Sequence, residues 1–226
     1  MGLIATDKGD GGDFTPCPAG VHIGVCYTVL DLGTQVGEFK GDATRKHEVY
    51  VGWEIPAELV TIERDGKDVE VPMTVGKFYT MSLNKKANLR KHLDAWRGKD
   101  FTEKELEGFD LFAVIGKACQ IQVTHYVKAD GKENAKVENI MALPKGVPAP
   151  KPVTPAVRYS ISDGGEIPEG VKEGIVKIIH KSEEWQAMSA APGTNRPDGR
   201  VSAEELAAAD KAAGAVTEDE LDDTPF

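Results

Sequence analysis

The sequence predicts a mainly β, α+β fold of five strands, with one helical region between the third and the fourth strand. Of five segments, three alternate residues with a period of two, which is typical of half-buried strands, the third is rich in aromatic and β-compatible residues, and the fifth follows a hairpin turn. Between the third and fourth segments the apolar residues recur at helical spacing, and a proline-rich stretch follows the fifth. These three observations indicate a β domain with a helical insert.

Each expected strand is a run in which apolar residues face one side and polar or small residues face the other. Glycine-rich residues 33–41 are expected to form the loop between the first two strands. Turns are expected at residues 64–67, where two further short strands can flank the turn, and at residues 129–132, where the last two strands form a hairpin. The expected strands cover residues 21–30, 48–55, 78–83, 119–127 and 135–143.

The helical insert carries its own start and stop signals. Asn84 is placed to cap a helix over residues 85–96, whose apolar side chains are spaced for one buried face, and Gly98 ends it. Residues 102–105 (Thr-Glu-Lys-Glu) form a capping box that opens a second short helix, which can extend toward Phe112. The insert is therefore expected to contain two helices.

Strand, strand, strand, helix, strand, strand is the order of elements in an OB-fold, a five-stranded barrel. The order favours that barrel, although the same elements can also build an unrelated α+β sheet. Residues 168–188 predict a C-terminal helix that packs back onto the barrel or onto a neighbour. The expected organisation is an extended arm at 1–20, an OB-fold domain at 21–145, a proline-rich connection and helix at 146–190, and a disordered acidic tail at 191–226.

The 226 residues include 27 Lys and Arg against 37 Asp and Glu, a formal net charge of −10. Taken alone, that charge argues against a nucleic-acid binder, whose surface is usually basic. Its distribution changes the argument, because residues 1–145 hold 19 basic and 22 acidic residues and residues 198–226 hold nine acidic and two basic. The acidity lies largely in the tail and does not exclude nucleic acid as a ligand of the preceding domain.

Residues 77–99 hold seven Lys and Arg against the single acid Asp94, interleaved with aromatic and amide residues. This mixture suits single-stranded nucleic acid, because cations follow the phosphates while aromatic faces stack on bases. The alternative is that the cations only solvate the outer face of a helix. Trp96 is expected in the core rather than as a stacking platform.

A second candidate surface lies on the second strand and the loop before it. Tyr50 shares a face with Gly52, which leaves room for a base, and Lys40 and Lys46 lie in or beside a loop that OB-folds use to grip oligonucleotides. The alternative for Tyr50 is a cross-strand aromatic residue packed under the C-terminal helix. Trp53, on the opposite face, is expected in the core.

No catalytic, metal or cofactor site is expected. The five histidines have no metal-ligand spacing, the three cysteines form no disulfide or zinc pattern, and no nucleotide-binding or nucleophile motif occurs. The carboxylates that follow Thr102 suit a helix N-terminus better than a nuclease metal site. Neither a secretory signal nor an apolar run of about 18 residues is present, so we expect a cytoplasmic protein without a membrane span.

The chain ends in Asp222-Asp223-Thr224-Pro225-Phe226, which places a large apolar side chain beside the terminal carboxylate. Both groups suit a partner pocket with apolar walls and a basic rim. This ending resembles the acidic tip of bacterial single-stranded DNA-binding proteins, which implies that it recruits replication or recombination proteins. A long acidic tail can also be a simple solubiliser.

A wider resemblance rests on residues 78–90 and 96–99, which are similar to the Enc34-type family of phage single-stranded DNA-binding proteins. It implies an OB-fold protein that coats single-stranded DNA in the cytoplasm of an infected host, without catalysis, during phage replication or recombination. The helical insert and the proline-rich segment differ from the bacterial homologues. They argue against a tetramer like that of the bacterial proteins, and a homo-oligomer remains an alternative.

We therefore expect a non-catalytic single-stranded DNA-binding protein whose acidic tail competes with DNA for the basic surface. The alternatives are a phage protein-interaction or virion-associated module and, less favoured, a nuclease. The residues expected to contact DNA are Lys40, Lys46, Tyr50, Phe78, Lys85, Lys86, Asn88, Arg90, Lys91, Trp96 and Arg97, and those expected to contact partner proteins are Asp222, Asp223, Pro225 and Phe226.

Overall fold

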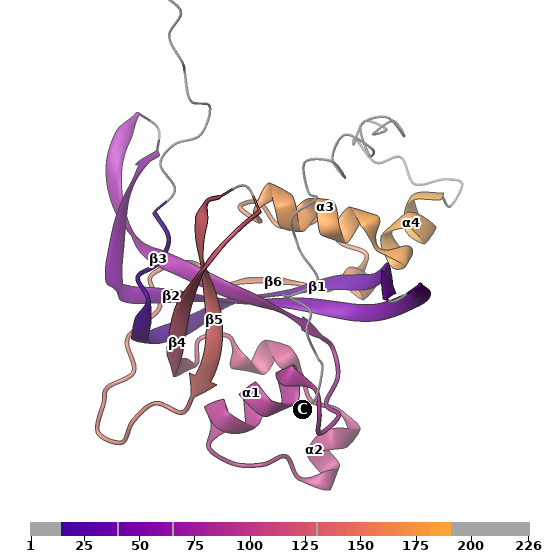
Figure 1. Cartoon of the computed structure of the whole chain (residues 1–226), viewed down its shortest axis with the longest axis horizontal. Helices are drawn as coiled ribbons and strands as arrows, with labels where there is room; N and C mark the ends of the chain where they lie inside the picture. The colour runs from indigo at the N-terminus through magenta and orange to yellow at the C-terminus, as the bar shows by residue number, and fades with distance from the viewer. Residues whose placement is uncertain (1–14, 40, 65, 130, 191–226) are drawn as a thin grey trace, which may run out of the picture.

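The computed structural model describes residues 15–39, 41–64, 66–129 and 131–190, which are built around an antiparallel sheet in the strand order β3-β2-β1-β4-β5 (Figure 1). A short additional strand, β6, pairs in parallel with β1. The mainly β, α+β class is confirmed. The strands are β1 (Gly20–Phe39), β2 (Asp42–Arg64), β3 (Lys67–Thr80), β4 (Ala118–Val127), β5 (Glu133–Met141) and β6 (Val157–Tyr159). The helices are α1 (Asn88–Arg97), α2 (Glu103–Glu107), α3 (Glu173–Lys181) and α4 (Glu183–Ala190), with 3₁₀ turns η1 (Leu111–Val114) and η2 (Ile161–Asp163).

The first two strands extend beyond their predicted ends and form a long hairpin. β1 pairs with β2 as far as Asp42, so the loop predicted at residues 33–41 is wrong over most of its length. The register shifts between Asp31 and Gly33, which has a φ of 71°. A Cβ on Gly33 would lie 2.6 Å from the Cβ of Ser182. This glycine therefore marks a bulge and a close approach of the C-terminal helices.

The third strand begins earlier than the sequence pattern predicts. Arg64 pairs with Lys67, so the predicted turn at residues 64–67 is confirmed and joins β2 to β3. The strand expected only from residue 78 runs from Lys67 and ends at Thr80. Its first half lies on an exposed arm and alternates Val69, Val71 and Met73 with polar residues and Pro72, so the short strand that we allow after the turn is continuous with the strand expected from residue 78.

Helix α1 starts three residues later than predicted. The Asn84 side chain does not cap it but accepts a hydrogen bond from the backbone N–H of Lys86 at 3.1 Å. The N-cap is instead Ala87, whose side chain offers no acceptor. The predicted stop is confirmed, because Gly98 adopts a left-handed conformation with a φ of 66°.

The predicted capping box of α2 is confirmed. The Glu105 N–H donates to Thr102 Oγ1 at 3.3 Å, and the Glu105 carboxylate accepts from the Thr102 N–H at 2.9 Å. The helix ends at Glu107 and does not reach Phe112, which lies in η1. The last two predicted strands are also confirmed as the hairpin β4–β5.

The sheet is not closed into a barrel. Within residues 15–190 as described, no backbone ladder joins the two edge strands, β3 and β5. Their cross-link is a side-chain contact, in which Lys77 Nζ donates to the carbonyl of Val137 at 2.8 Å. The closed five-stranded barrel is therefore not formed, and the coarser prediction of a five-stranded antiparallel sheet with a helical insert stands.

The first apolar cluster lies between the sheet and the helical layer of α1 and η1 (Figure 1). Trp53 is 1% exposed, and its ring centroid lies 5.7 Å from that of Trp96 on α1. Leu93 of α1 and Leu111 of η1 complete the contact with the sheet. The core position that we predict for Trp53 is confirmed.

A second apolar cluster lies on the opposite face of the sheet, under the C-terminal segment. The single helix predicted over residues 168–188 is two helices, α3 and α4, separated at the extended residue Ser182. Ile179 is completely buried, and it packs with Trp185 and Tyr50. The segment packs back onto its own sheet, which was one of the two predicted arrangements.

The start of the described chain is also packed against the sheet. Cys17 is buried, and its carbonyl lies 2.7 Å from Nε2 of His125 on β4. Residues 15–19 of the predicted N-terminal arm are thus fixed to β4, and β1 begins at Gly20. Residues 1–14, and the tail predicted at 191–226, lie outside the described residues.

Candidate nucleic-acid interface

Three of the seven cations in residues 77–99 make contacts within the fold. Lys77 bonds to β5, and the Arg90 guanidinium donates to the carbonyl of Leu83 at 3.0 Å and to Asp94 at 3.2 Å. Arg90 is buried, and its guanidinium lies 5.4 Å from the centroid of the Phe101 ring. The predicted DNA contact at Arg90 therefore has a structural role here, because this side chain holds α1 to the chain on both sides of it.

The Arg97 guanidinium also makes its contacts within the helical layer. Its guanidinium bonds to the Glu105 carboxylate and lies 4.1 Å from the centroid of the Phe101 ring. The pKa of Glu105 is lowered mainly by the Thr102 N–H that it accepts, and the Arg97 charge acts in the same direction. Arg97 thus joins α1 to α2 and turns its charge toward a carboxylate instead of toward solvent.

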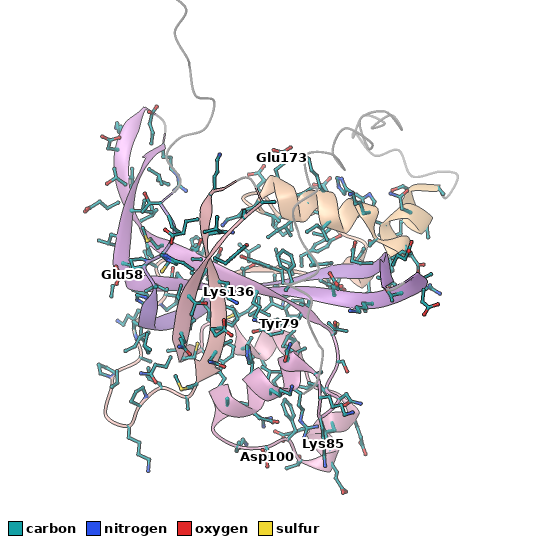
Figure 2. The ribbon with its side chains drawn as sticks, in the orientation of Figure 1. Glu58, Tyr79, Lys85, Asp100, Lys136 and Glu173 are labelled. Carbon is teal, nitrogen blue, oxygen red and sulfur yellow. The ribbon has the colours of Figure 1, made fainter. Side chains whose placement is uncertain are left out.

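The remaining four cations are exposed and have no bonded acid within the described part of the chain: Lys85, Lys86, Lys91 and Lys99. Residues 84–93 contain no acidic residue, and the neighbouring Asp94 is occupied by Arg90 and by the N–H of Phe101. Figure 2 shows Lys85 at the outer end of the helical layer, with Glu173 on the opposite side of the sheet. The exposed Asp100 is labelled in the same part of this view and α2 carries three carboxylates, so the layer holds charges of both signs, with Lys85 and Lys86 before the N-terminus of α1 and Lys99 after its C-terminus.

The same end holds the N-terminus of α1. Asn88 is its first residue and is half-buried, and Ala87 provides no side-chain cap for the first backbone N–H groups. The positive end of the helix dipole therefore adds to the charge of Lys85 and Lys86. His92 adds none at neutral pH, because burial and the nearby Lys77 and Lys91 lower its pKa to about 4.

Tyr50 and Phe78 lie on the other face of the sheet, away from α1. They form a cross-strand pair with ring centroids 5.1 Å apart. Tyr50 is buried in the second cluster and Phe78 is half-buried against it. A Cβ on Gly76 would collide with the Tyr50 hydroxyl, so the small residues make room for the tyrosine itself. The structure supports the packed alternative for Tyr50, under the C-terminal helices.

Trp96 occupies the core position that we favour for it. It is 8% exposed, and its indole N–H donates to the carbonyl of Ala118 at 3.0 Å. This bond places the C-terminal end of α1 against the start of β4. The ring cannot stack on a base without leaving the core, so the geometry does not support the predicted DNA contact at Trp96.

Lys46 of the β1–β2 hairpin is not brought to the α1 surface. Lys46 is half-buried on β2 opposite Gln35, and its charge acts on the buried Glu48. Lys40 lies outside the described residues, as do the four tip residues predicted to contact proteins, which are Asp222, Asp223, Pro225 and Phe226. The structure therefore tests none of these five.

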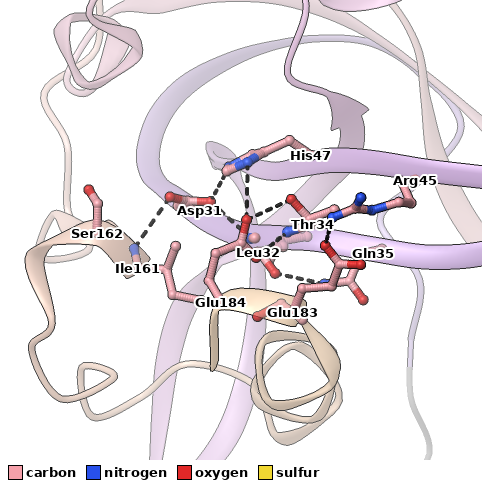
Figure 3. A network of polar contacts seen from close by, with 12 residues as sticks. Asp31, Leu32, Thr34, Gln35, Arg45, His47, Ile161, Ser162, Glu183 and Glu184 are labelled. Atoms are coloured by element: carbon pink, nitrogen blue, oxygen red, sulfur yellow. Dashed lines mark hydrogen bonds and ion pairs between the residues drawn. The ribbon is translucent and has the colours of Figure 1, made fainter. Parts of the chain in front are cut away.

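A polar network fixes α4 to the β1–β2 hairpin (Figure 3). Thr34 donates through its N–H and its hydroxyl to the two oxygens of Glu184, each at 2.6 Å. Glu183 forms an ion pair with Arg45. His47 lies between two carboxylates, with Nε2 2.7 Å from Asp31 and Nδ1 3.8 Å from Glu184. Apart from the His47–Asp31 contact between β2 and β1, these contacts join α4 to the hairpin whose second strand sequence reasoning treats as a DNA surface.

A buried carboxylate holds the segment that leads into β6. Glu54 is completely buried on β2, and its two oxygens accept the backbone N–H groups of Val153 at 2.6 Å and Thr154 at 2.7 Å. The second face of the sheet is therefore covered from residue 153 to α4. The helical layer lies on the other face and is not covered by α3 and α4.

Comparison with protein-family models and with curated proteins finds no match. The description of the site therefore rests on the structure. Among residues 15–190 as described, no helix is long and apolar enough to cross a membrane, and no group of three or more His, Cys, Asp or Glu side chains is placed to hold a metal ion.

Sequence reasoning missed Phe112 and Arg158 as a pair. The two residues are 46 positions apart, and the Arg158 guanidinium lies 5.8 Å from the centroid of the Phe112 ring. Arg158 belongs to β6, a strand of three residues that gives no periodic signal. Only the parallel pairing of β6 with β1 brings it to the side of the sheet that carries η1.

Proposed function

We propose that the protein binds single-stranded DNA without catalysis, through the helical layer around α1. The observation that carries the proposal is the group of exposed lysines on α1 and on both sides of it, which have no acidic partner among the described residues. Such a group offers several cations to a flexible phosphate backbone, and binding by phosphate contacts requires no reactive side chain. The DNA-contact surface then consists of Lys85, Lys86, Asn88, Lys91 and Lys99.

The arrangement of the sheet supports an OB-type domain. An OB-fold is a five-stranded and partly open barrel, and here the open side lies between β3 and β5, bridged by Lys77. The helical insert between β3 and β4 covers one face of the sheet. OB-folds bind oligonucleotides through strand faces and loops, whereas the contact surface proposed here lies on the insert.

The proposal assigns the protein to phage DNA replication or recombination, with the acidic tip as the part that recruits other proteins. The tail then has a second effect, because its charge competes with DNA for the lysines of α1. A protein ending at residue 197 should bind oligo(dT) more tightly than the full chain at low salt, and equally at high salt. Unchanged or weaker binding at low salt would contradict this competition.

A charge-matched pair of variants tests the DNA surface. Replacement of Lys85, Lys86 and Lys91 with Gln should weaken binding of fluorescein-labelled oligo(dT), measured by anisotropy, by at least about tenfold at low salt. It should also reduce the slope of log affinity against log salt by about 2, since each phosphate contact on a single strand contributes about 0.7. Gln at Lys67, Lys145 and Lys151, which are also exposed, removes the same charge and should change both values much less.

Two outcomes contradict the proposal. Equal losses in the two triple variants would assign binding to net charge and not to the surface around α1. Binding of duplex as tight as that of oligo(dT), or no binding of either, would favour the second candidate, a protein-interaction module. That candidate has one specific observation in its support, because Leu59 is 53% exposed and Val69 38% exposed on the projecting β2–β3 hairpin.

A further inference from the structure

A hollow of about 410 Å³ lies between η1 and the segment that enters β6, and it is lined by Phe112, Ile115, Ala156 and Arg158. Three of the four residues offer apolar surface, and the fourth is an exposed arginine. The volume lies in the range of about 300–1,000 Å³ that is typical of small-ligand sites. None of these residues belongs to the lysine surface described above.

Both walls of the hollow are fixed by backbone contacts. The Phe112 N–H donates to the Asp110 carboxylate at 2.9 Å, and the Ile115 N–H donates to the carbonyl of Phe112 at 3.1 Å. On the other wall, Arg158 is held opposite Val29 by the pairing of β6 with β1. The hollow is therefore a feature of ordered turns and strands rather than of a loop.

The chemistry of the hollow suits one nucleotide. The Arg158 guanidinium lies over the half-buried Phe112 ring, so a base stacks on this ring in place of the guanidinium, which stacks on planar rings and also binds phosphate oxygens. Arg158 makes no ion pair among the described residues, and the Asp110 carboxylate accepts the N–H of Phe112 through one of its oxygens. The cation is thus available to an anionic ligand.

Two further exposed lysines lie in the chain next to α1 and next to a wall of the hollow. The bond from Trp96 to the carbonyl of Ala118 brings the end of α1 to the start of β4, close to the exposed Lys99. Lys117, also exposed, directly precedes Ala118 and follows Ile115 of the hollow by two residues.

We propose that the hollow holds one nucleotide of the bound strand, with its base against Phe112 and its phosphate at Arg158. The inference rests on the proposed function and adds a base-recognition site to a surface otherwise made of phosphate contacts. Stacking on an aromatic ring does not depend on base identity, so this site strengthens binding without selecting a sequence.

The test compares oligo(dT) with an abasic oligonucleotide of equal length, which keeps the phosphates and lacks the bases. The wild-type protein should bind oligo(dT) about tenfold more tightly than the abasic strand, which is within the effect of one base stack. Phe112→Leu, which keeps an apolar side chain against the core, should bring this ratio close to one without changing the affinity for the abasic strand. Arg158→Gln should weaken binding of both strands, and Arg64→Gln, which alters an exposed arginine on the β2–β3 hairpin, should weaken neither.

The possible failures are distinguishable. Wild-type affinity of both Phe112→Leu and Arg158→Gln for both strands would overturn the nucleotide site while the proposed function stands. Absence of binding to either strand by the wild-type protein would overturn the proposed function and this site with it. Unfolding in urea checks that Phe112→Leu is folded; if it is not, Arg158→Gln decides alone, because its exposed side chain fills no core space, and wild-type binding by that variant overturns the site.

Discussion

The two faces of the sheet differ in where their cover comes from. One face is covered by α1 and η1, which lie in the chain between β3 and β4, the strands that bound this insert. The other is covered by α3 and α4, more than a hundred residues after the β2 residues that they contact. Both covers bury large side chains completely or nearly so. Local sequence order therefore decides the first face, and long-range packing decides the second.

The alternation of β2 assigns its residues to these faces. Trp53 points into the first cluster, whereas Tyr50, Gly52 and Glu54 belong to the second face. The glycine has a packing role, because a Cβ at Gly52 would lie 2.6 Å from a methyl group of Thr28 and 3.1 Å from the Tyr50 ring. The space beside Gly52 that the sequence analysis assigns to a base is filled by the side chains of Thr28 and Tyr50.

The largest expected difference between the faces comes from truncating one large side chain on each. Trp53→Ala should lower the free energy of unfolding by about 3–5 kcal/mol, and Ile179→Ala by about 2–5 kcal/mol, because each leaves a cavity in a packed cluster. Urea unfolding followed by circular dichroism measures both losses. Amide hydrogen exchange should then show faster opening of residues 157–190 in Ile179→Ala, with β1 to β5 less affected.

Uniformly faster exchange in both variants would show that the two clusters open as one unit. Leu30→Val is a milder control, because Leu30 is buried in the second cluster and the change removes a single methylene. It should reproduce the exchange pattern of Ile179→Ala with a smaller loss of stability, of about 1 kcal/mol.

The fold was predictable where the pattern is local. The hairpin β4–β5, the stop at Gly98 and the capping box at Thr102 follow from spacing and turn chemistry alone. The β1–β2 hairpin was not, because Gly33 looks like a loop residue until Ser182 is known to lie against it. Neither β6 nor the open edge between β3 and β5 has a local signal, since both depend on pairing between distant residues.

The candidate site divides in the same way. Charge density predicted the exposed Lys85, Lys86 and Lys91, because long cationic side chains remain in water unless a partner is close. It could not separate them from Arg90 and Arg97, whose partners Leu83 and Glu105 are set by the packing of the insert. An aromatic residue in a basic segment can stack on a nucleotide base or pack in the protein core, and the sequence alone does not distinguish the two roles.

The first face also carries a titratable group, which predicts a dependence of stability on pH. The Tyr79 hydroxyl lies 2.8 Å from Nδ1 of His92, and burial followed by the charge of Lys77 lowers the pKa of His92 from 6.5 to about 4. The unfolded chain therefore binds more protons than the folded chain between these two values. Stability should fall as the pH drops through this window, by up to about 3 kcal/mol for this group.

Urea unfolding between pH 7.5 and pH 4 measures the dependence, and His92→Gln should flatten it, because the amide does not titrate and can still bond to Tyr79. The carboxylates of the protein contribute in both proteins, so the difference between the two curves is the relevant quantity. Identical curves would show that the imidazole is solvated and that the first face admits water.

The second face contains the buried Glu54 carboxylate, which accepts two backbone N–H groups, and its replacement should have a smaller effect. Glu54→Gln keeps the shape of the side chain but loses the charge, so it can no longer offer two anionic oxygens to Val153 and Thr154. The loss should be about 1.5–3 kcal/mol, which is typical of hydrogen bonds to a charged group. Glu70→Gln, on the exposed arm of β3, should change stability by less than about 0.5 kcal/mol. Unchanged exchange protection of the Val153 and Thr154 amides would contradict the role of Glu54 in holding the cover.

The smallest expected effect concerns the outer rim of the first cover. Thr102→Ala removes the hydroxyl that accepts the Glu105 N–H and should cost about 1 kcal/mol. Thr102→Ser keeps that acceptor and should retain most of the stability, so an equal loss in both variants would assign the effect to the methyl group instead. Because Glu105 also binds Arg97, the alanine variant should raise amide exchange in α2 and at the end of α1 while leaving α3 and α4 unchanged. Faster amide exchange in α3 or α4 would mean that the sheet transmits the change at Thr102 to the helices on its other face, which do not contact this cap.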